Sequence, residues 1–123
     1  MKSARPISNM QLVDALCDVS IPLREARRVH LETYGTLIPH VFMADVLARV
    51  GQCLGAARAP GSAPHAAEVE SIMAALERGL ADGERETRNV IALSFARDSQ
   101  LETFFTELRM LMGPRTSTQL RGQ

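Results

Sequence analysis

The sequence predicts an all-α protein, a single domain (1–123) in which five to seven antiparallel helices form a bundle or a short stack. Apolar residues recur at spacings of three and four along most of the chain. Residues that start and end helices bracket these runs, and no alternation of apolar and polar residues lasts beyond a few positions. The 123 residues, 46% of them hydrophobic and 23% charged, suit one domain with one core.

The first half of the chain predicts three helices. Residues 8–11, Ser-Asn-Met-Gln, have the pattern of a capping box, so a helix is expected near 9–18. Pro22 suits the first turn of a second helix, which should end at Gly35. Pro39 opens a third helix in the same way. The positions that mark the three helices are Met10, Val13, Leu16 and Cys17, then Leu23, Ala26, Arg27, His30 and Leu31, then Phe42, Met43, Val46, Leu47, Val50 and Leu54.

The second half predicts a loop and three more helices. Residues 59–65 hold two prolines and a glycine, and we expect a flexible surface loop there. A fourth helix should end near Gly83, and a fifth should begin at once. A second capping box, 99–102, predicts a sixth helix that stops at Gly113. The polar tail near 115–123 should fray. The apolar positions of these helices are Val69, Ile72, Met73, Leu76 and Leu80, then Val90, Ile91, Ser94 and Phe95, then Leu101, Phe104, Phe105, Leu108, Leu111 and Met112.

Residues 75–93 resemble the turn of a HEAT-type helical hairpin. In such repeats an Asp and a following Arg-containing pattern tie two helices together. One such unit is visible, whereas a repeat array needs about three. We therefore expect a local HEAT-like feature within one domain.

Charge and hydropathy disfavour two classes of partner. Fourteen basic and fourteen acidic residues give a formal net charge of zero, whereas nucleic-acid binders carry a basic surplus. The longest run without a charged residue, 33–44, has twelve residues and contains a proline, so it is too short for a membrane span. We expect neither nucleic acid nor membrane as a partner.

The two cysteines, Cys17 and Cys53, lack the spacing of a metal or redox motif. No apolar segment of a signal peptide follows Lys2 and Arg5. We expect reduced, buried thiols in a cytoplasmic protein, and a disulfide between the two remains the alternative.

The polar residues carry no signature of catalysis or metal binding. His30, His40 and His65 lack the mutual spacing and the cysteine neighbours of a zinc site. No phosphate loop or nucleophile motif occurs. We expect no metal, no cofactor and no enzymatic activity, and an enzyme or a small-molecule binder built inside the bundle is the weakest alternative.

The segment 68–86 is the first candidate binding surface. It holds six acidic residues against Arg78 and Arg85, and an acidic surface can steer and dock a basic partner. The alternative is a merely solubilising surface. Reversal of three of these charges to Lys, at 70, 77 and 84, is expected to leave folding intact. The six acidic residues are Glu68, Glu70, Glu77, Asp82, Glu84 and Glu86.

Residues 33–43 form the second candidate surface. This junction between two predicted helices is free of charged side chains and contains the single tyrosine. Such an apolar run is usually core. We expect part of it to reach the surface as a patch, with Tyr34 and His40 at its rim.

Three short runs in the sequence are similar to a small bacterial all-helical family. They are Tyr34-Gly35-x-Leu37-x-Pro39-His40-Val41-Phe42-Met43-x-Asp45-Val46, Leu76-Glu77-x-Gly79 and Val90-Ile91-Ala92-x-Ser94-Phe95. Its members resemble the immunity proteins encoded beside polymorphic toxins, and the similarity covers about residues 20–115. The resemblance implies a non-enzymatic cytoplasmic protein that binds and occludes a cognate toxin with a basic surface. A general helical interaction or regulatory module is the alternative, and the oligomeric state is left open.

Overall fold

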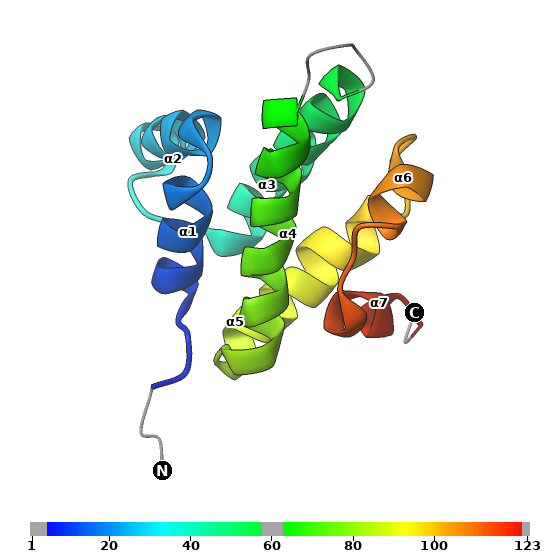
Figure 1. Cartoon of the computed structure of the whole chain (residues 1–123). Coiled ribbons are helices and arrows are strands. Elements are labelled where there is room, and N and C mark those ends of the chain that lie inside the picture. The colour runs from blue at the N-terminus through cyan, green and yellow to red at the C-terminus, as the bar shows by residue number, and fades with distance from the viewer. Residues whose placement is uncertain (1–4, 58–62, 122–123) are drawn as a thin grey trace.

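The computed structural model describes residues 5–57 and 63–121, and its architecture is all-α (Figure 1). Within these residues no strand forms, and an isolated parallel bridge joins Ile7 to Gly83. No helix in the same ranges has the length and apolar character needed to cross a membrane. The elements are α1 (Asn9–Asp18), α2 (Ile21–Tyr34), α3 (Pro39–Ala56), α4 (Ala63–Asp82), α5 (Arg85–Ile91), the π-helix η1 (Ala92–Arg97), α6 (Phe105–Arg109) and α7 (Pro114–Arg121).

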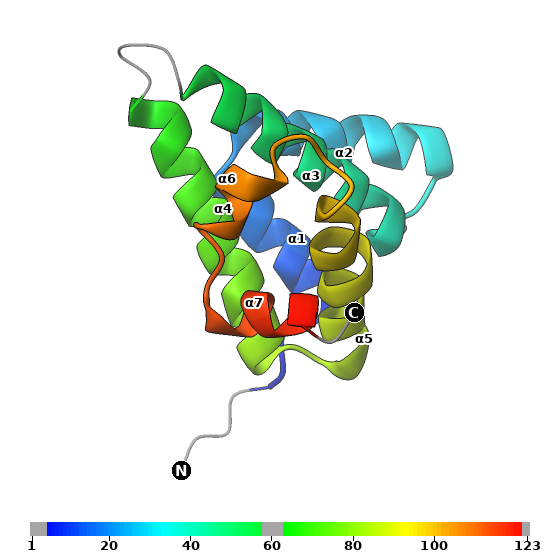
Figure 2. The same ribbon diagram turned by 90° about the vertical axis from the view of Figure 1, so that its right-hand side faces the viewer.

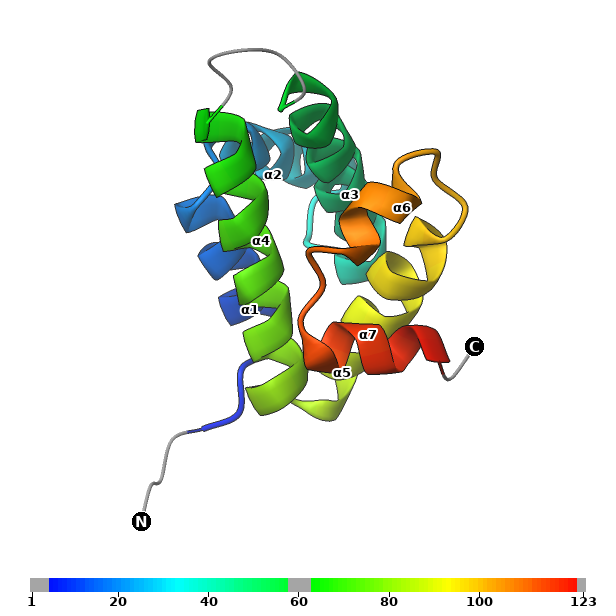
Figure 3. The same cartoon turned by 45° about the vertical axis from the view of Figure 1, so that its right-hand side comes forward.

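Helix α4 is the centre of the arrangement. It is the longest helix, with 20 residues, and it contacts α1, α3, α5 and α7. Figure 3 shows α1 and α7 on opposite sides of α4. The π-helix η1, coloured dark yellow in Figure 2, packs against α3 and α7.

The buried apolar side chains of the described residues form one cluster beneath these helices. All the apolar positions predicted for α3 and α4 lie in it, as the periodicity requires. The largest of the fully buried side chains include Phe42, Phe95, Leu12, Leu16 and Met43.

Local signals at the first three helices are confirmed. Ser8 Oγ accepts the Gln11 N–H at 3.2 Å while Gln11 Oε1 accepts the Ser8 N–H at 2.9 Å, so the capping box forms. Gly35 ends α2 with a φ of +78°, a left-handed conformation that glycine adopts without steric cost.

The predicted sixth helix is wrong in its first half. Residues 101–104 form turns, α6 spans five residues, and Leu101, predicted in its apolar stripe, is 85% exposed. The preceding helix continues through η1 to Ser99, which is buried. Ser99 Oγ therefore donates to the Ala96 carbonyl at 2.7 Å, and it caps no new helix.

The polar tail, for which the sequence suggests at most one short helical turn around Leu120, contains the helix α7 from Pro114 to Arg121. Thr116 in its first turn is fully buried. Of the loop predicted at 59–65, residues 59–62 lie outside the described part of the chain. Residues 63–65 already belong to α4, because a proline fits the first turn of a helix.

The predicted HEAT-like turn between α4 and α5 is held by the N-terminal segment. Ile7 N–H donates to the Asp82 carbonyl and Glu84 N–H donates to the Ile7 carbonyl, both at 2.8 Å. Thr87 Oγ1 also donates to Asn9 Oδ1 at 2.9 Å, so α1 and α5 share this anchor.

Candidate functional site

Glu68, predicted on an acidic binding surface, is a structural residue. Both Nε and Nη2 of Arg49 donate to its carboxylate, at 2.7 and 2.8 Å, and Ser20 Oγ donates at 2.6 Å. Hydrogen bonds from Arg49, and next from Ser20, lower the pKa of Glu68 to about 2, although burial opposes this shift. The carboxylate thus joins α3 and α4 to the start of α2 and is not offered to a partner.

Glu77 is the second correction to the predicted acidic surface. Its carboxylate accepts the N–H groups of Arg115 at 2.8 Å and Thr116 at 3.1 Å, and the Thr116 hydroxyl at 3.0 Å. It therefore caps the first turn of α7, whose N–H groups have no partner within the helix. For the same reason a Lys at this position is now expected to destabilise α7, contrary to the expectation from the sequence that it leaves folding intact.

The other four predicted acidic residues are exposed, but they are spread over two helices. Glu70 lies on α4 and Asp82 at the end of that helix. Glu84 and Glu86 lie at the start of α5, where the helix dipole favours negative charge. Glu86 also lines a pocket with His40, described below.

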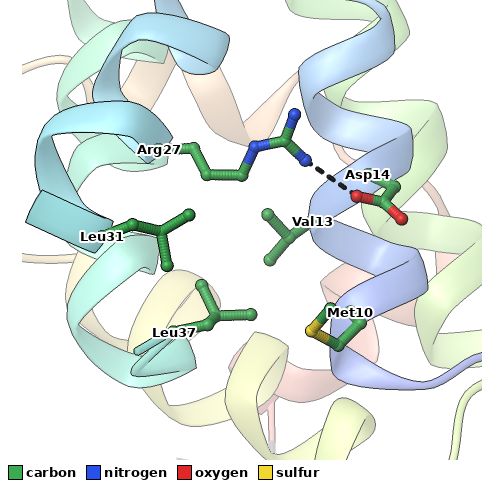
Figure 4. Close-up of a pocket in the computed structure, with 6 residues that line it drawn as sticks. All are labelled: Met10, Val13, Asp14, Arg27, Leu31 and Leu37. Atoms are coloured by element: carbon green, nitrogen blue, oxygen red, sulfur yellow. Dashed lines mark hydrogen bonds and ion pairs between the residues drawn. The ribbon is translucent and has the colours of Figure 1, made fainter. Parts of the chain in front are cut away.

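A groove between α1 and α2 is lined mainly by apolar side chains (Figure 4). It has a volume of about 310 Å³. Met10 and Leu31 lie on its two sides and are 63% and 42% exposed. An ion pair, Arg27 Nη1 to Asp14 Oδ1 at 2.7 Å, closes one end. The lining residues are Met10, Val13, Asp14, Arg27, Leu31 and Leu37.

The groove follows from helical spacing on two helices that pack side by side. Met10, Val13 and Asp14 are three and four residues apart on α1, so they share one face. Arg27 and Leu31 are four apart on α2 and face them (Figure 4). Met10 and Leu31 were predicted as stripe residues, and both lie at the edge of the core rather than within it.

A second, more polar pocket is lined by residues that are close in sequence to those of the groove. It is lined by Asn9, Pro39, His40, Glu86, Asn89 and Val90, and its volume is about 340 Å³. Asn9 precedes the groove residue Met10, and Pro39 lies two residues after the groove residue Leu37. His40 Nδ1 lies 2.5 Å from Ser94 Oγ, which joins the start of α3 to η1.

Leu37 is the residue of the predicted patch 33–43 that lines the groove. Tyr34, half-exposed at the end of α2, packs its ring on His30 with centroids 4.8 Å apart. His40 is exposed in the polar pocket, and Leu37 forms part of the groove wall. Phe42 and Met43 are the buried residues of this run, and the others are exposed or half-buried, so the expectation that most of such a run is core is wrong here.

Sequence reasoning missed the role of His30. This residue is buried, and its Nε2 accepts the Ile38 N–H at 2.9 Å. The spacing of Leu23, Ala26 and His30 along α2 is the signal that could have placed it on the buried side.

The two thiols and the acidic groups show no metal-binding arrangement. Cys17 and Cys53 are free and buried, and burial raises the pKa of both. Among the residues that the structure describes, no three His, Cys, Asp or Glu side chains come together as metal ligands would.

The groove, with the Tyr34–His40 junction beside it, is the strongest candidate site because two of its apolar side chains, Met10 and Leu31, are open to solvent. It offers contact area and one ion pair, which are means of recognition rather than of catalysis. Comparison of the chain with known protein families, curated proteins and solved structures finds no match.

Proposed function

We propose that this chain is a non-enzymatic protein-binding protein and that its α1–α2 groove receives apolar side chains of a partner. The observation that carries the proposal is the groove itself, in which the exposed side chains of Met10 and Leu31 lie beside a single ion pair. Burial of apolar surface contributes about 25 cal/mol per Å², so a complementary partner gains affinity by covering these side chains. Met10 adds a flexible thioether, a group suited to adaptable contacts.

An amphipathic helix is the partner segment that fits best. Two helices flank the groove, so a third helix can lay its apolar face between them, as in other helix-in-groove complexes. Arg27 and Asp14 at one end offer a donor and an acceptor to a polar residue of that helix. The volume of about 310 Å³ is at the small end for a drug-sized ligand, which makes a small molecule the second choice.

The sequence resemblance supports a more specific form of this proposal. The partner is then a toxin with a basic surface, which the chain binds and occludes in the cytoplasm. The exposed acids Glu70, Asp82, Glu84 and Glu86 would speed its approach, and Glu86 lies beside His40 in the pocket next to the groove.

Peptide display tests the groove. Displayed peptides of about 20 residues with helical apolar stripes are selected on the wild-type chain and then measured on Leu31→Asp. We expect binding to fall by about tenfold or more, because a buried carboxylate would replace a contact residue. Leu93→Asp is the matched control, since Leu93 is 44% exposed but lies on η1. Equal losses in the two variants would refute the groove as the binding site.

Co-expression tests the toxin. The gene beside this one is expressed in a bacterial host, alone and together with the chain. We expect growth arrest by the neighbour, relief by the wild-type chain and by Leu93→Asp, and no relief by Leu31→Asp. A neighbour that is harmless, or a toxic one that the chain leaves active, would contradict the toxin proposal and leave the general binding module.

A further inference from the structure

His30 of α2 holds the N-cap residue of α3 in place. Its Nε2 accepts the N–H of Ile38 at 2.9 Å. Ile38 is the N-cap residue of α3, and its carbonyl accepts the N–H groups of Val41 and Phe42 at 3.0 Å. No side chain caps this helix start, so the histidine fixes the entry of the chain into α3.

The histidine ring is itself held by its neighbours. Tyr34 packs on it with centroids 4.8 Å apart, and Phe42 meets it edge-on at 5.9 Å. The ring is almost fully buried, at 3% exposure. Because Nε2 accepts a hydrogen bond from an N–H, this nitrogen carries no proton, and the proton of the neutral ring lies on Nδ1.

The segment held by His30 is part of the groove wall. Leu37, directly before Ile38, lines the groove opposite α1. Three residues, 36–38, lie between the left-handed Gly35 and the first residue of α3. Movement of the Ile38 backbone therefore displaces Leu37 as well.

We infer that His30 is a pH-sensitive latch on the binding groove. When Nε2 takes up a proton it becomes a donor, so the Ile38 N–H loses its acceptor and two donors face each other. The 36–38 segment then leaves the ring, and the groove loses the wall that Leu37 supplies. The effect on binding rests on the function proposed above, whereas the movement of the segment does not.

Three titratable or charged groups lie near the ring. From α3, Asp45 interacts electrostatically with His30 and gives the imidazolium a counter-charge. Burial raises the pKa of Asp45, and the charge on His30 opposes that shift. On α2, the titratable Tyr34 contacts the ring, and Arg27, one turn earlier, is paired with Asp14 of α1.

Hydrogen exchange of the Ile38 amide tests the latch without any partner. Protection factors, which correct for the intrinsic pH dependence of exchange, are measured by NMR at about pH 7.5 and about pH 5.5, across the range in which imidazole titrates. We expect the wild-type protection of Ile38 to fall by about tenfold, the effect of losing one hydrogen bond.

Two substitutions at His30 distinguish the role of its hydrogen-bond acceptor from the role of its aromatic ring. His30→Gln offers Oε1 as an acceptor that does not titrate, so Ile38 should stay protected at both pH values. His30→Phe keeps an aromatic ring between Tyr34 and Phe42 but lacks an acceptor, so protection should be low at both. His40→Gln is the control for an exposed histidine and should behave as wild type.

Four outcomes decide the inference. Wild-type protection that is equal at the two pH values overturns the latch, as does a pH response that persists in His30→Gln. If the protection of Ile38 falls at low pH while the selected peptides bind equally at both pH values, the link between His30 and the groove is refuted. If the latch responds and no peptide binds at either pH, the proposed function fails and the latch stands.

Discussion

Two glutamates of α4 show how burial decides the role of a charged residue. Glu68 accepts hydrogen bonds from Arg49 and Ser20, while Glu70, two positions further on, is exposed. Residues two apart on a helix point in directions about 200° apart, so they meet different surroundings. A count of acidic residues along the sequence treats them alike, although only one is open to a partner.

Glu68→Gln should lower the free energy of unfolding by roughly 3 kcal/mol at pH 7, because the pKa of this carboxyl falls from 4.5 to about 2 on folding. A lowered pKa stabilises the fold above about pH 4.5, and this contribution is lost as the pH falls toward 2. Urea unfolding at pH 7 and pH 3 measures both effects.

The glutamine variant should therefore lose less stability than wild type between pH 7 and pH 3. Glu70→Gln is the matched control and should shift stability by no more than about 0.5 kcal/mol. An equal loss in the two variants at pH 7 would show that the Arg49 ion pair contributes nothing to folding.

At the scale of elements, α7 depends on a side chain from a distant helix. Glu77→Lys removes the acceptor for the N–H groups of Arg115 and Thr116 and places a cation at a helix N-terminus. We expect a loss of about 1–2 kcal/mol and earlier proteolytic cleavage within α7. Glu70→Lys, at an exposed position within α4, should leave the cleavage pattern unchanged. Resistance of α7 to protease in Glu77→Lys would contradict this capping role.

Helix α3 offers a matched pair of glycines. A Cβ at Gly51 would lie 2.5 Å from Cε2 of Phe104, whereas a Cβ at Gly55 meets nothing within 4 Å. Gly51→Ala should therefore destabilise the protein by about 1–3 kcal/mol, because the phenyl ring must move. Gly55→Ala should stabilise it by about 0.5–1 kcal/mol, since alanine is the better helix former. Thermal unfolding of both variants checks the difference in sign.

Local elements were predictable, and elements that need a distant partner were not. The box at Ser8 and Gln11 formed because both partners lie within one turn. The box at Ser99 failed because the incoming helix already used that hydroxyl. Helix α7 was missed because its cap, Glu77, lies 38 residues away in sequence. The groove was missed for the same reason, since it needs the packing of α1 against α2.

The whole molecule can be probed through its two thiols. Cys17 on α1 and Cys53 on α3 are both buried and free, and burial raises the pKa of each. We expect a thiol reagent to label the native protein slowly, at a rate that tracks unfolding, because the thiolate forms only when the core opens. Denatured protein without reductant should give two thiols. Rapid native labelling, or no thiols after denaturation, would contradict this.

The number of residues in the π-helix η1 determines the direction of the helices that follow it. A π turn holds one residue more than an α turn, so it rotates everything that follows by about 100° relative to an uninterrupted α-helix. Here that rotation falls before the segment that carries Phe104 to its place over Gly51. Removal of one residue from Ala92–Arg97 would leave a helix but aim the C-terminal quarter in another direction. The one extra residue of the π turn therefore sets the orientation of α6 and α7. A related sequence that lacks one residue within this helix is expected to place its C-terminal helices differently.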